Sequence, residues 1–371
     1  MQIGKSEGNI RFTKEELKIF DSTRGLLSIL VVIGHITQIV WLSVFGIGII
    51  SNIMGSIANI SVMIFFFLSG VLITFSAINL TNENRFNYKK FFLNRITRIY
   101  PTLTFSLILV YGLMILFKFV NGSYVISKLP TDLYNVRDMF YVSPFQILRT
   151  FTLLLTDIIN INGPMWSLFI EWWLYISAMF LFIAIKKKPL IIKVIFFLIS
   201  VLPLIYIYKS FGVGGLFDIA IWFLGFTYTM FINSNKKAKI SLLLISLIIV
   251  GALVLIKGIS VLNITTSEPR YYGFIQILYV VLFLNFFSKL KFLKWFKSFA
   301  PFSYTLYLIH FPIILFINSV LHKYLLNNLF YLTLETIFDF IIVIAISYFV
   351  AKITENKYAY RKYFNKAVSQ T

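Results

Sequence analysis

A series of long apolar stretches constrains this chain more than any other feature. A helix needs roughly 20 mostly apolar residues to cross the hydrocarbon core of a bilayer. Ten such stretches follow one another, at residues 22–42, 57–78, 100–120, 164–185, 190–208, 216–231, 240–256, 271–287, 301–320 and 329–351. The sequence therefore predicts an all-α, polytopic integral membrane protein with about ten transmembrane helices.

The composition favours lipid over water as the surroundings of this chain. Hydrophobic residues make up 59% of it and charged residues only 13%, whereas soluble domains carry roughly 25% charged residues. The chain has no cysteine, which excludes disulfides and a cysteine nucleophile. Its three histidines lack the spacing that is typical of a zinc site, so we expect no bound metal.

The charge of the loops predicts how the helices are oriented. Short cytoplasmic loops are enriched in Lys and Arg. With ten spans and both termini in the cytoplasm, 26 of the 34 basic residues fall on the inner side. The net charge of +20 therefore reflects membrane orientation, and we expect membrane lipids rather than nucleic acid as partners. We predict a multi-pass protein of the cell membrane.

We expect residues 1–371 to form a single transmembrane domain. The longest connection, residues 121–163, is predicted to be a partly ordered outer loop, and residues 352–371 a cytoplasmic tail. The segment Asn84–Ile99 is basic, aromatic and too polar to span a membrane. It is predicted to form an amphipathic helix on the inner leaflet.

Three polar residues lie on one face of the first span. Asp21 and Arg24 precede His35 by 14 and 11 residues. Because a helix turns about 100° per residue, all three share one stripe, with His35 about 16 Å deeper than Arg24. A titratable imidazole near mid-membrane indicates function. The alternative is a buried His bonded to a neighbouring helix, with Asp21 and Arg24 as a simple interfacial ion pair.

The fourth span carries a second candidate. Glu171 lies near its outer end, on the same face as Ser167 and Tyr175, and its expected partner is His35. The alternative is a protonated Glu that bonds between helices. The pair Ser69–Gly70 in the second span is explained by helix packing alone.

Two further motifs are ambiguous on spacing alone. Arg95 and Arg98 lie three residues apart on one helical face, and two guanidiniums match phosphate oxygens well. Positive-inside anchoring explains them equally. In the ninth span Ser303 and His310 share a face, although a lone His there is more often a packing or hydrogen-bonding residue.

Taken together, these segments resemble the acyltransferase 3 family of membrane acyltransferases. Five motifs occur in the family's order and span most of the chain. They are Arg24 and His35 separated by ten residues and preceded by Asp21, aromatic-Phe-Leu-Ser-Gly at Phe66–Gly70, Arg-x-x-Arg-Ile-x-Pro at Arg95–Pro101, Trp-Ser-Leu-x-x-Glu at Trp166–Glu171, and Ser-Tyr-x-Leu-Tyr-Leu-x-His at Ser303–His310.

The resemblance implies transfer of an acyl group, commonly acetyl, from cytoplasmic acyl-CoA to a hydroxyl of an extracytoplasmic or lipid-linked glycan. On this reading His35 is the base, and Asp21 or Glu171 orients its imidazole. A covalent acyl-His is a variant. Donor binding is expected from Arg24, Arg95 and Arg98, and substrate binding from Trp166, Ser167, Tyr175, Ser303, Tyr304 and His310.

Two other classes of function compete with an enzyme. Intramembrane His, Glu and Arg also suit a transporter or flippase for a glycan or lipid intermediate. Such transporters often contain inverted repeats and broken helices, and neither is evident in the sequence. A non-catalytic partner in polysaccharide export is the third class. Consumption of acyl-CoA separates the enzyme from both.

Overall fold

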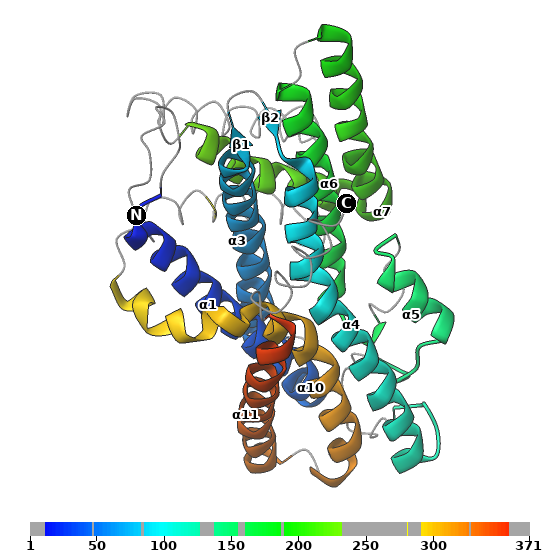
Figure 1. The fold of residues 1–371 in the computed structure, drawn as a ribbon. Helices are drawn as coiled ribbons and strands as arrows, with labels where there is room; N and C mark the ends of the chain where they lie inside the picture. Colours follow the sequence, from blue (N-terminus) through cyan, green and yellow to red (C-terminus); the bar gives the residue numbers. More distant parts are fainter. Residues whose placement is uncertain are drawn as a thin grey trace, which may run out of the picture. The chain divides into compact units, whose positions relative to one another are not determined.

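The computed structural model describes residues 12–46, 48–82, 85–126, 137–154, 160–186, 189–231, 280, 291–325 and 328–355. Helices dominate this part of the chain (Figure 1). They are α1 (Lys14–Ile36), the π-helical turn η1 (Thr37–Trp41), α2 (Leu42–Phe45), α3 (Ile49–Asn79), α4 (Tyr88–Asn121), α5 (Pro144–Phe151), α6 (Met165–Lys186), α7 (Leu190–Phe231), the 3-10 helix η5 (Lys291–Phe302), α10 (Ser303–Leu325) and α11 (Leu329–Thr354). Between α3 and α4 the short strands β1 (Thr81–Asn82) and β2 (Arg85–Phe86) pair antiparallel.

Seven helices in the described part of the chain are long and apolar enough to cross a membrane. This confirms the all-α, polytopic membrane class. The longest, α7, has 42 residues and a contour length of about 63 Å, twice the roughly 30 Å of the hydrocarbon core. Its backbone leaves helical geometry at Gly212, where φ is 61°, between the two crossings that the sequence predicts there. Residues 240–256 and 271–287 lie outside the described residues, so the total of ten spans stays a prediction.

The start of α4 corrects one expectation. The basic segment Asn84–Ile99 does not form a separate interfacial helix, because α4 is continuous from Tyr88 to Asn121. A helix of 34 residues is about 51 Å long and exceeds the hydrocarbon core. Its polar first turns can therefore extend out of the apolar layer while the rest crosses it.

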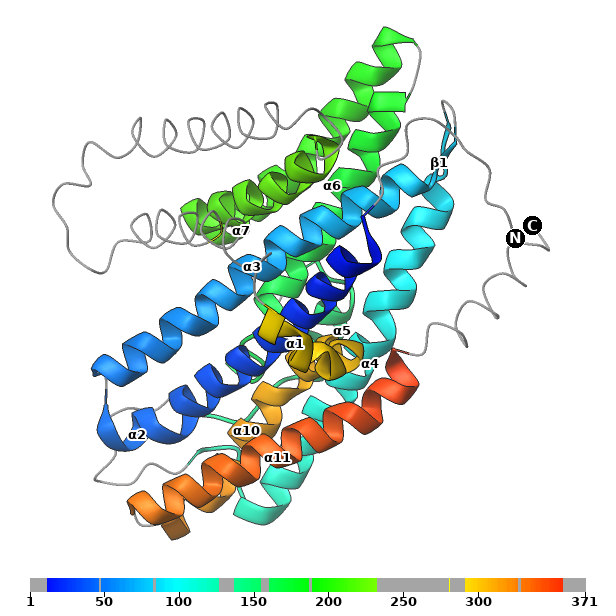
Figure 2. The same cartoon turned by 90° about the vertical axis from the view of Figure 1, so that its left-hand side faces the viewer.

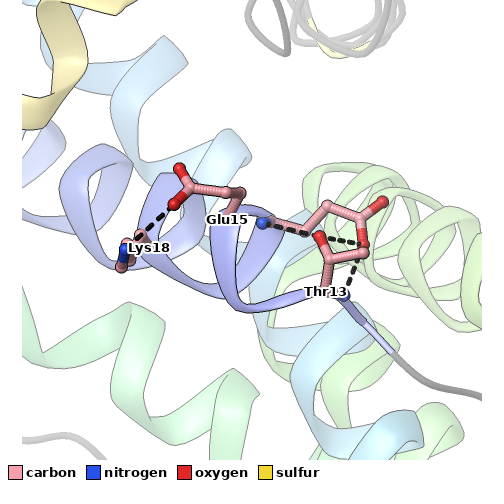
Figure 3. Close-up of polar contacts among 4 residues, drawn as sticks. Thr13, Glu15 and Lys18 are labelled. Atoms are coloured by element: carbon pink, nitrogen blue, oxygen red, sulfur yellow. Dashed lines mark hydrogen bonds and ion pairs between the residues drawn. The ribbon is translucent and has the colours of Figure 1, made fainter.

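A capping box begins α1 (Figure 3). The Thr13 hydroxyl accepts a hydrogen bond from the Glu16 backbone N–H at 3.2 Å, and the Glu16 carboxylate accepts one from the Thr13 N–H at 2.7 Å. The pair satisfies two backbone donors that the first turn leaves open. Lys18 and Glu15 form an ion pair at 2.9 Å beside it. Asp21, Arg24 and His35 thus share one uninterrupted helix.

The chain divides into two compact units, each built from three separate segments. The first unit comprises residues 1–20, 63–95 and 170–291, and the second comprises residues 21–62, 96–169 and 292–371.

In the first unit, α3 and α7 approach each other closely at two glycines. A Cβ atom on Gly70 would lie 2.1 Å from the carbonyl oxygen of Trp222, and one on Gly225 would lie 2.1 Å from that of Phe67. No side chain fits at either distance, so the crossing requires glycine on both helices. This confirms helix packing as the role of Gly70.

In the second unit, α10 and α11 lie side by side and run antiparallel (Figure 2). At one end the Glu355 carboxylate accepts hydrogen bonds from Thr305, and toward the other end Asn318 Nδ2 donates to Glu335 at 3.0 Å. Opposite order along the two helices is the signature of an antiparallel pair.

Helix α1 runs parallel to α10 in the same unit. Arg24 contacts Ser303, and His35, further along α1, contacts His310, further along α10. Beyond His35, the Trp41 indole N–H donates to Thr336 at 2.8 Å. The second unit therefore has an arginine end, defined by Arg24 and Ser303, and an opposite end beyond the histidines.

We expect Gly70→Ala to destabilise the protein, because the added methyl would overlap the α7 backbone. Overpacking of this kind costs about 1–3 kcal/mol or more. Thermal unfolding in detergent measures the loss. Gly112→Ala on α4 is the matched control, since a Cβ there meets nothing within 4 Å; equal melting temperatures for the two variants would contradict the proposed close crossing.

Candidate active site

Two histidines meet inside the second unit. His35 Nδ1 lies 2.8 Å from His310 Nε2, and the rings are stacked with centroids 5.0 Å apart. His310 Nδ1 lies 2.8 Å from the backbone carbonyl of Leu306. A carbonyl only accepts, so His310 Nδ1 carries a hydrogen, and a neutral His310 then presents a lone pair at Nε2. His35 Nδ1–H donates to that lone pair, which leaves the lone pair of His35 on Nε2.

Exposure separates the two imidazoles. His310 is completely buried, whereas His35 is half-buried. The ring of Phe311 meets His35 edge-on with centroids 5.1 Å apart. His35 is thus the member of the pair whose free nitrogen can reach a bound molecule, and His310 supports it from behind.

A proline beside the histidine pair shapes α10. Pro312 has no N–H, so the Leu308 carbonyl loses its partner within the helix. Two side chains replace it: Asn162 Nδ2 donates to the Leu308 carbonyl at 2.8 Å and Ser106 Oγ donates at 3.1 Å. These bonds tie α4 and the segment before α6 to the turn of α10 that carries His310.

Residues of two sequence motifs come together here. The hydroxyls of Ser167 and Tyr307 lie 2.7 Å apart, and the Tyr307 ring centroid lies 6.1 Å from that of His310. Trp166 and Tyr304, the neighbouring predicted substrate residues, are half-buried in the same unit. The structure therefore brings Ser167 close to the predicted His310.

The arginine end of the unit gathers other predicted residues. Arg24 Nη2 donates to the Ser303 hydroxyl at 3.4 Å, and its Nη1 lies 3.9 Å from Asp21 Oδ1. The Asp21 side chain is 52% exposed, so this ion pair adds little stability. Asp21 is about 21 Å from His35 along α1. The structure thus places Asp21 beside Arg24 and not beside His35.

Glu355 joins this end of the unit, although the sequence did not single it out. Its carboxylate accepts hydrogen bonds from the Thr305 N–H at 2.9 Å and the Thr305 hydroxyl at 2.7 Å. Burial raises the pKa of Glu355, while the Thr305 bonds and the charges of Arg24 and Arg98 act to lower it. Arg98 is therefore close enough to Glu355 for their charges to interact.

Glu171 belongs to a polar cluster in the first unit. Its Oε1 accepts hydrogen bonds from Ser69 Oγ at 3.0 Å and from the Tyr175 hydroxyl, and the Trp222 indole N–H donates to Ser69 Oγ at 3.3 Å. The cluster joins α3, α6 and α7. His35, the partner expected for Glu171, lies in the second unit, so their pairing stays a prediction.

The two arginines of α4 have different surroundings. Arg95 is 7% exposed, its Nη2 donates to Ser76 Oγ at 2.7 Å, and its guanidinium lies 5.2 Å from the Phe91 ring centroid and 5.5 Å from that of Tyr175. Arg98 is half-buried. Arg98 is accordingly the better candidate for binding a phosphate, and Arg95 is built into the packing of the first unit.

The comparison with known families decides the class of the protein. A family model described as an acyltransferase domain matches residues 17–353. The chain belongs to the acyltransferase 3 family. This confirms the resemblance drawn from the five motifs and shows that the protein is an acyltransferase with membrane helices. No curated protein and no solved structure gives a significant match.

Within this acyltransferase, sequence reasoning missed three features of the site. It did not pair His35 with His310, although both lie mid-span in helices of equal predicted orientation. It interpreted Ser69 as packing only, although a hydroxyl beside an intramembrane acid is a natural partner. It overlooked Glu355, an acid at the predicted inner end of the last span, where basic residues prevail.

Glu355→Gln tests whether folding raises the pKa of the Glu355 carboxyl. A carboxyl whose pKa is raised by folding contributes stability at low pH, which is lost as pH rises toward its folded pKa. Gln keeps the acceptor oxygen but does not ionise. We expect the melting temperature of the wild type, relative to Glu355→Gln, to fall as the pH is raised above 4.5, the ordinary pKa of a glutamate.

Thermal unfolding in detergent across this range checks the expectation. Glu15→Gln, at an exposed glutamate of α1, reports the background effect of removing one carboxylate. The difference in melting temperature between wild type and Glu355→Gln could instead stay constant or rise with pH. That result would show that the charges of the arginines outweigh the effect of burial on Glu355.

Proposed function

We propose that this acyltransferase moves an acyl group, commonly acetyl, from acyl-CoA to a hydroxyl of a glycan or lipid-linked saccharide. The observation that carries the proposal is the His35–His310 hydrogen bond, which leaves a lone pair on His35 Nε2. A half-buried imidazole with a defined tautomer is suited to remove a proton from a hydroxyl.

The donor is proposed to enter at the arginine end of the second unit. Arg24 and Arg98 supply guanidiniums, which match phosphate oxygens in charge and geometry. Arg24 is about 16 Å from His35 along α1, a distance that the pantetheine arm of CoA would bridge. Ser303, bonded to Arg24, would contact the same part of the donor.

The transfer step balances without any further reactant. His35 Nε2 takes the proton of the acceptor hydroxyl while the oxygen of that hydroxyl attacks the thioester carbonyl carbon. The tetrahedral intermediate then collapses, the C–S bond breaks, and the thiolate of CoA takes the proton back from His35. His310 acts as a positioning residue, because its Nε2 accepts from His35 Nδ1–H throughout and stabilises the imidazolium.

Other predicted residues are assigned to substrate contacts. Ser167 lies beside Tyr307 at the histidine pair, and we assign it, with Trp166 and Tyr304, to the acceptor. Glu171 and Tyr175, bonded to each other, remain candidates for catalysis and substrate binding. Asp21 would act through Arg24, and Arg95 through the packing beneath Tyr175.

The proposed reaction fits a protein of the cell membrane with ten spans and both termini in the cytoplasm. Parallel α1 and α10 agree with the first and ninth spans of that topology. The arginine end then faces cytoplasmic acyl-CoA. Residues 121–163 would lie on the acceptor side.

We expect purified protein to release free thiol from acetyl-CoA when membrane glycolipid is supplied. His35→Ala should lower the rate by at least about a hundredfold, the usual contribution of a general base. His322→Ala, at a histidine without an assigned role, is the matched control. Substantial turnover in His35→Ala would remove His35 from this role, and flux of unmodified glycolipid without thiol release would indicate transport.

His310→Leu tests the positioning role separately. The change removes the acceptor at Nε2 and keeps a buried apolar side chain, so His35 loses the bond that sets its tautomer. We expect kcat to fall by about ten- to a thousandfold with little change in KM for acetyl-CoA, together with an altered pH–rate profile. An unaltered profile would show that His310 only packs.

Arg24→Gln and Arg98→Gln should raise the KM for acetyl-CoA about tenfold or more, because each removes a charged partner of phosphate. Their effect on kcat should be smaller. Steady-state kinetics measure both constants. Lys352→Gln on α11, an exposed basic residue stacked on Tyr348, serves as the control; an equal rise in KM there would indicate a general charge effect.

A further inference from the structure

One arginine outside the family motifs contacts Phe311, the neighbour of the histidine pair. Arg137 belongs to the connection between α4 and α6, in a stretch held by backbone pairing. The Phe140 N–H donates to the Tyr124 carbonyl at 2.8 Å, and the Ile126 N–H donates to the Asp138 carbonyl at 3.0 Å. Arg137 is therefore placed by a short antiparallel bridge and not by a free loop.

The guanidinium of Arg137 lies over the ring of Phe311, the residue that follows His310 on α10. Its carbon lies 5.7 Å from the ring centroid of Phe311, the residue that meets His35 edge-on. Its Nε donates to the carbonyl of Asn160. The positive charge of Arg137 also acts on His35. Arg137 thus supplies a cation on the side of His35, in addition to Arg24 at the arginine end.

The segment that holds this guanidinium is itself fixed. Asn162 is completely buried and donates to Ser106 at 3.1 Å and to the Leu308 carbonyl at 2.8 Å. A Cβ on Gly163 would lie 3.3 Å from the Phe311 ring, so the backbone packs against the same phenyl group. Such fixed surroundings let a charge act on a reaction without first having to reorganise.

We propose that Arg137 stabilises the oxyanion of the tetrahedral intermediate. This inference rests on the proposed function: Arg137 is the partner of the negative charge that forms on the carbonyl oxygen of the thioester. An acceptor oxygen sits about 2.8 Å from the base and attacks a carbon about 3 Å further on. The oxyanion therefore forms on the order of 6 Å from His35, and the proposal places it beside Phe311, where the guanidinium of Arg137 lies 5.7 Å from the ring centroid.

The charges are arranged as the reaction requires. In the transition state His35 gains a positive charge and the carbonyl oxygen gains a negative one. A fixed guanidinium near His35 opposes the imidazolium when no oxyanion is present and is compensated when the oxyanion forms. The proposal places the oxyanion nearer to Arg137 than the imidazolium is, so that Arg137 stabilises the transition state more than the resting state, which is the condition for a lower barrier.

The test compares Arg137→Gln, Arg137→Lys and Arg149→Gln in detergent-purified full-length protein with acetyl-CoA and membrane glycolipid. Arg149 is the matched control. It lies in the same connection as Arg137, and its guanidinium also stacks on an aromatic ring, 5.5 Å from the Phe145 centroid. We expect Arg137→Gln to lower kcat by about 10²–10³-fold, the cost of losing one oxyanion partner. The KM values for acetyl-CoA and for the acceptor should stay within about twofold of wild type. The melting temperature should stay within a few degrees of wild type.

Two further readouts distinguish chemistry from structure. Arg137→Lys should recover part of the rate, since it restores a charge, and millimolar guanidinium ion should partly rescue Arg137→Gln but not His35→Ala. A kcat for Arg137→Gln equal to that of Arg149→Gln would overturn the inference while leaving the proposed function intact. A raised acceptor KM with unchanged kcat would assign Arg137 to acceptor binding and also overturn it. Absence of His35-dependent thiol release in the wild type would overturn the proposed function and this inference together.

Discussion

The hydrogen bond between His35 and His310 is the interaction on which the second unit's chemistry depends. Inside a membrane a polar group must find its partner within the protein. His310 satisfies this requirement in both directions, because it donates to the Leu306 carbonyl and accepts from His35. The same two bonds hold the rings together and decide which nitrogen of His35 remains basic. Packing and chemistry are therefore set by one chain of donors and acceptors.

The surroundings of this pair follow from the same requirement. Pro312 leaves the Leu308 carbonyl without a helical donor, and Asn162 and Ser106 supply donors from outside the helix. Because the side chain of Asn162 is held by that carbonyl, the backbone on either side of Asn162 is held in place too. Arg137 donates to the carbonyl of Asn160 in this segment, so one hydrogen-bond partner of Arg137 lies two residues from Asn162.

The sequence predicted the helices of the described part well, because apolar length and loop charge are local properties. It predicted that Gly70 serves packing, and the close approach of Trp222 bears this out. It failed at Asn84–Ile99, since polarity alone cannot tell a separate helix from the protruding start of a long one. It also did not pair His35 with His310, although these two side chains form the hydrogen bond that the structure shows.

The reason for that failure is general. Periodicity shows which side chains share a face of one helix, but it does not say which helix the face meets. Ser69 and Glu171 lie 102 residues apart, and Arg24 and Ser303 lie 279 apart. Motif order identified the family because it needs no such pairing. The partners of each motif required coordinates.

The long separation within the second unit also bears on how the protein is made. Its defining contacts join α1 and η1 to α10 and α11 across 275 to 295 residues. A chain emerging from the ribosome therefore inserts α1, with its Arg24 and His35, long before the partners of these side chains exist. Until then the polar stripe of α1 must be sheltered by the translocation machinery, by lipid headgroups or by other helices. The histidine pair would thus be among the last features to form, and its assembly would coincide with completion of the fold.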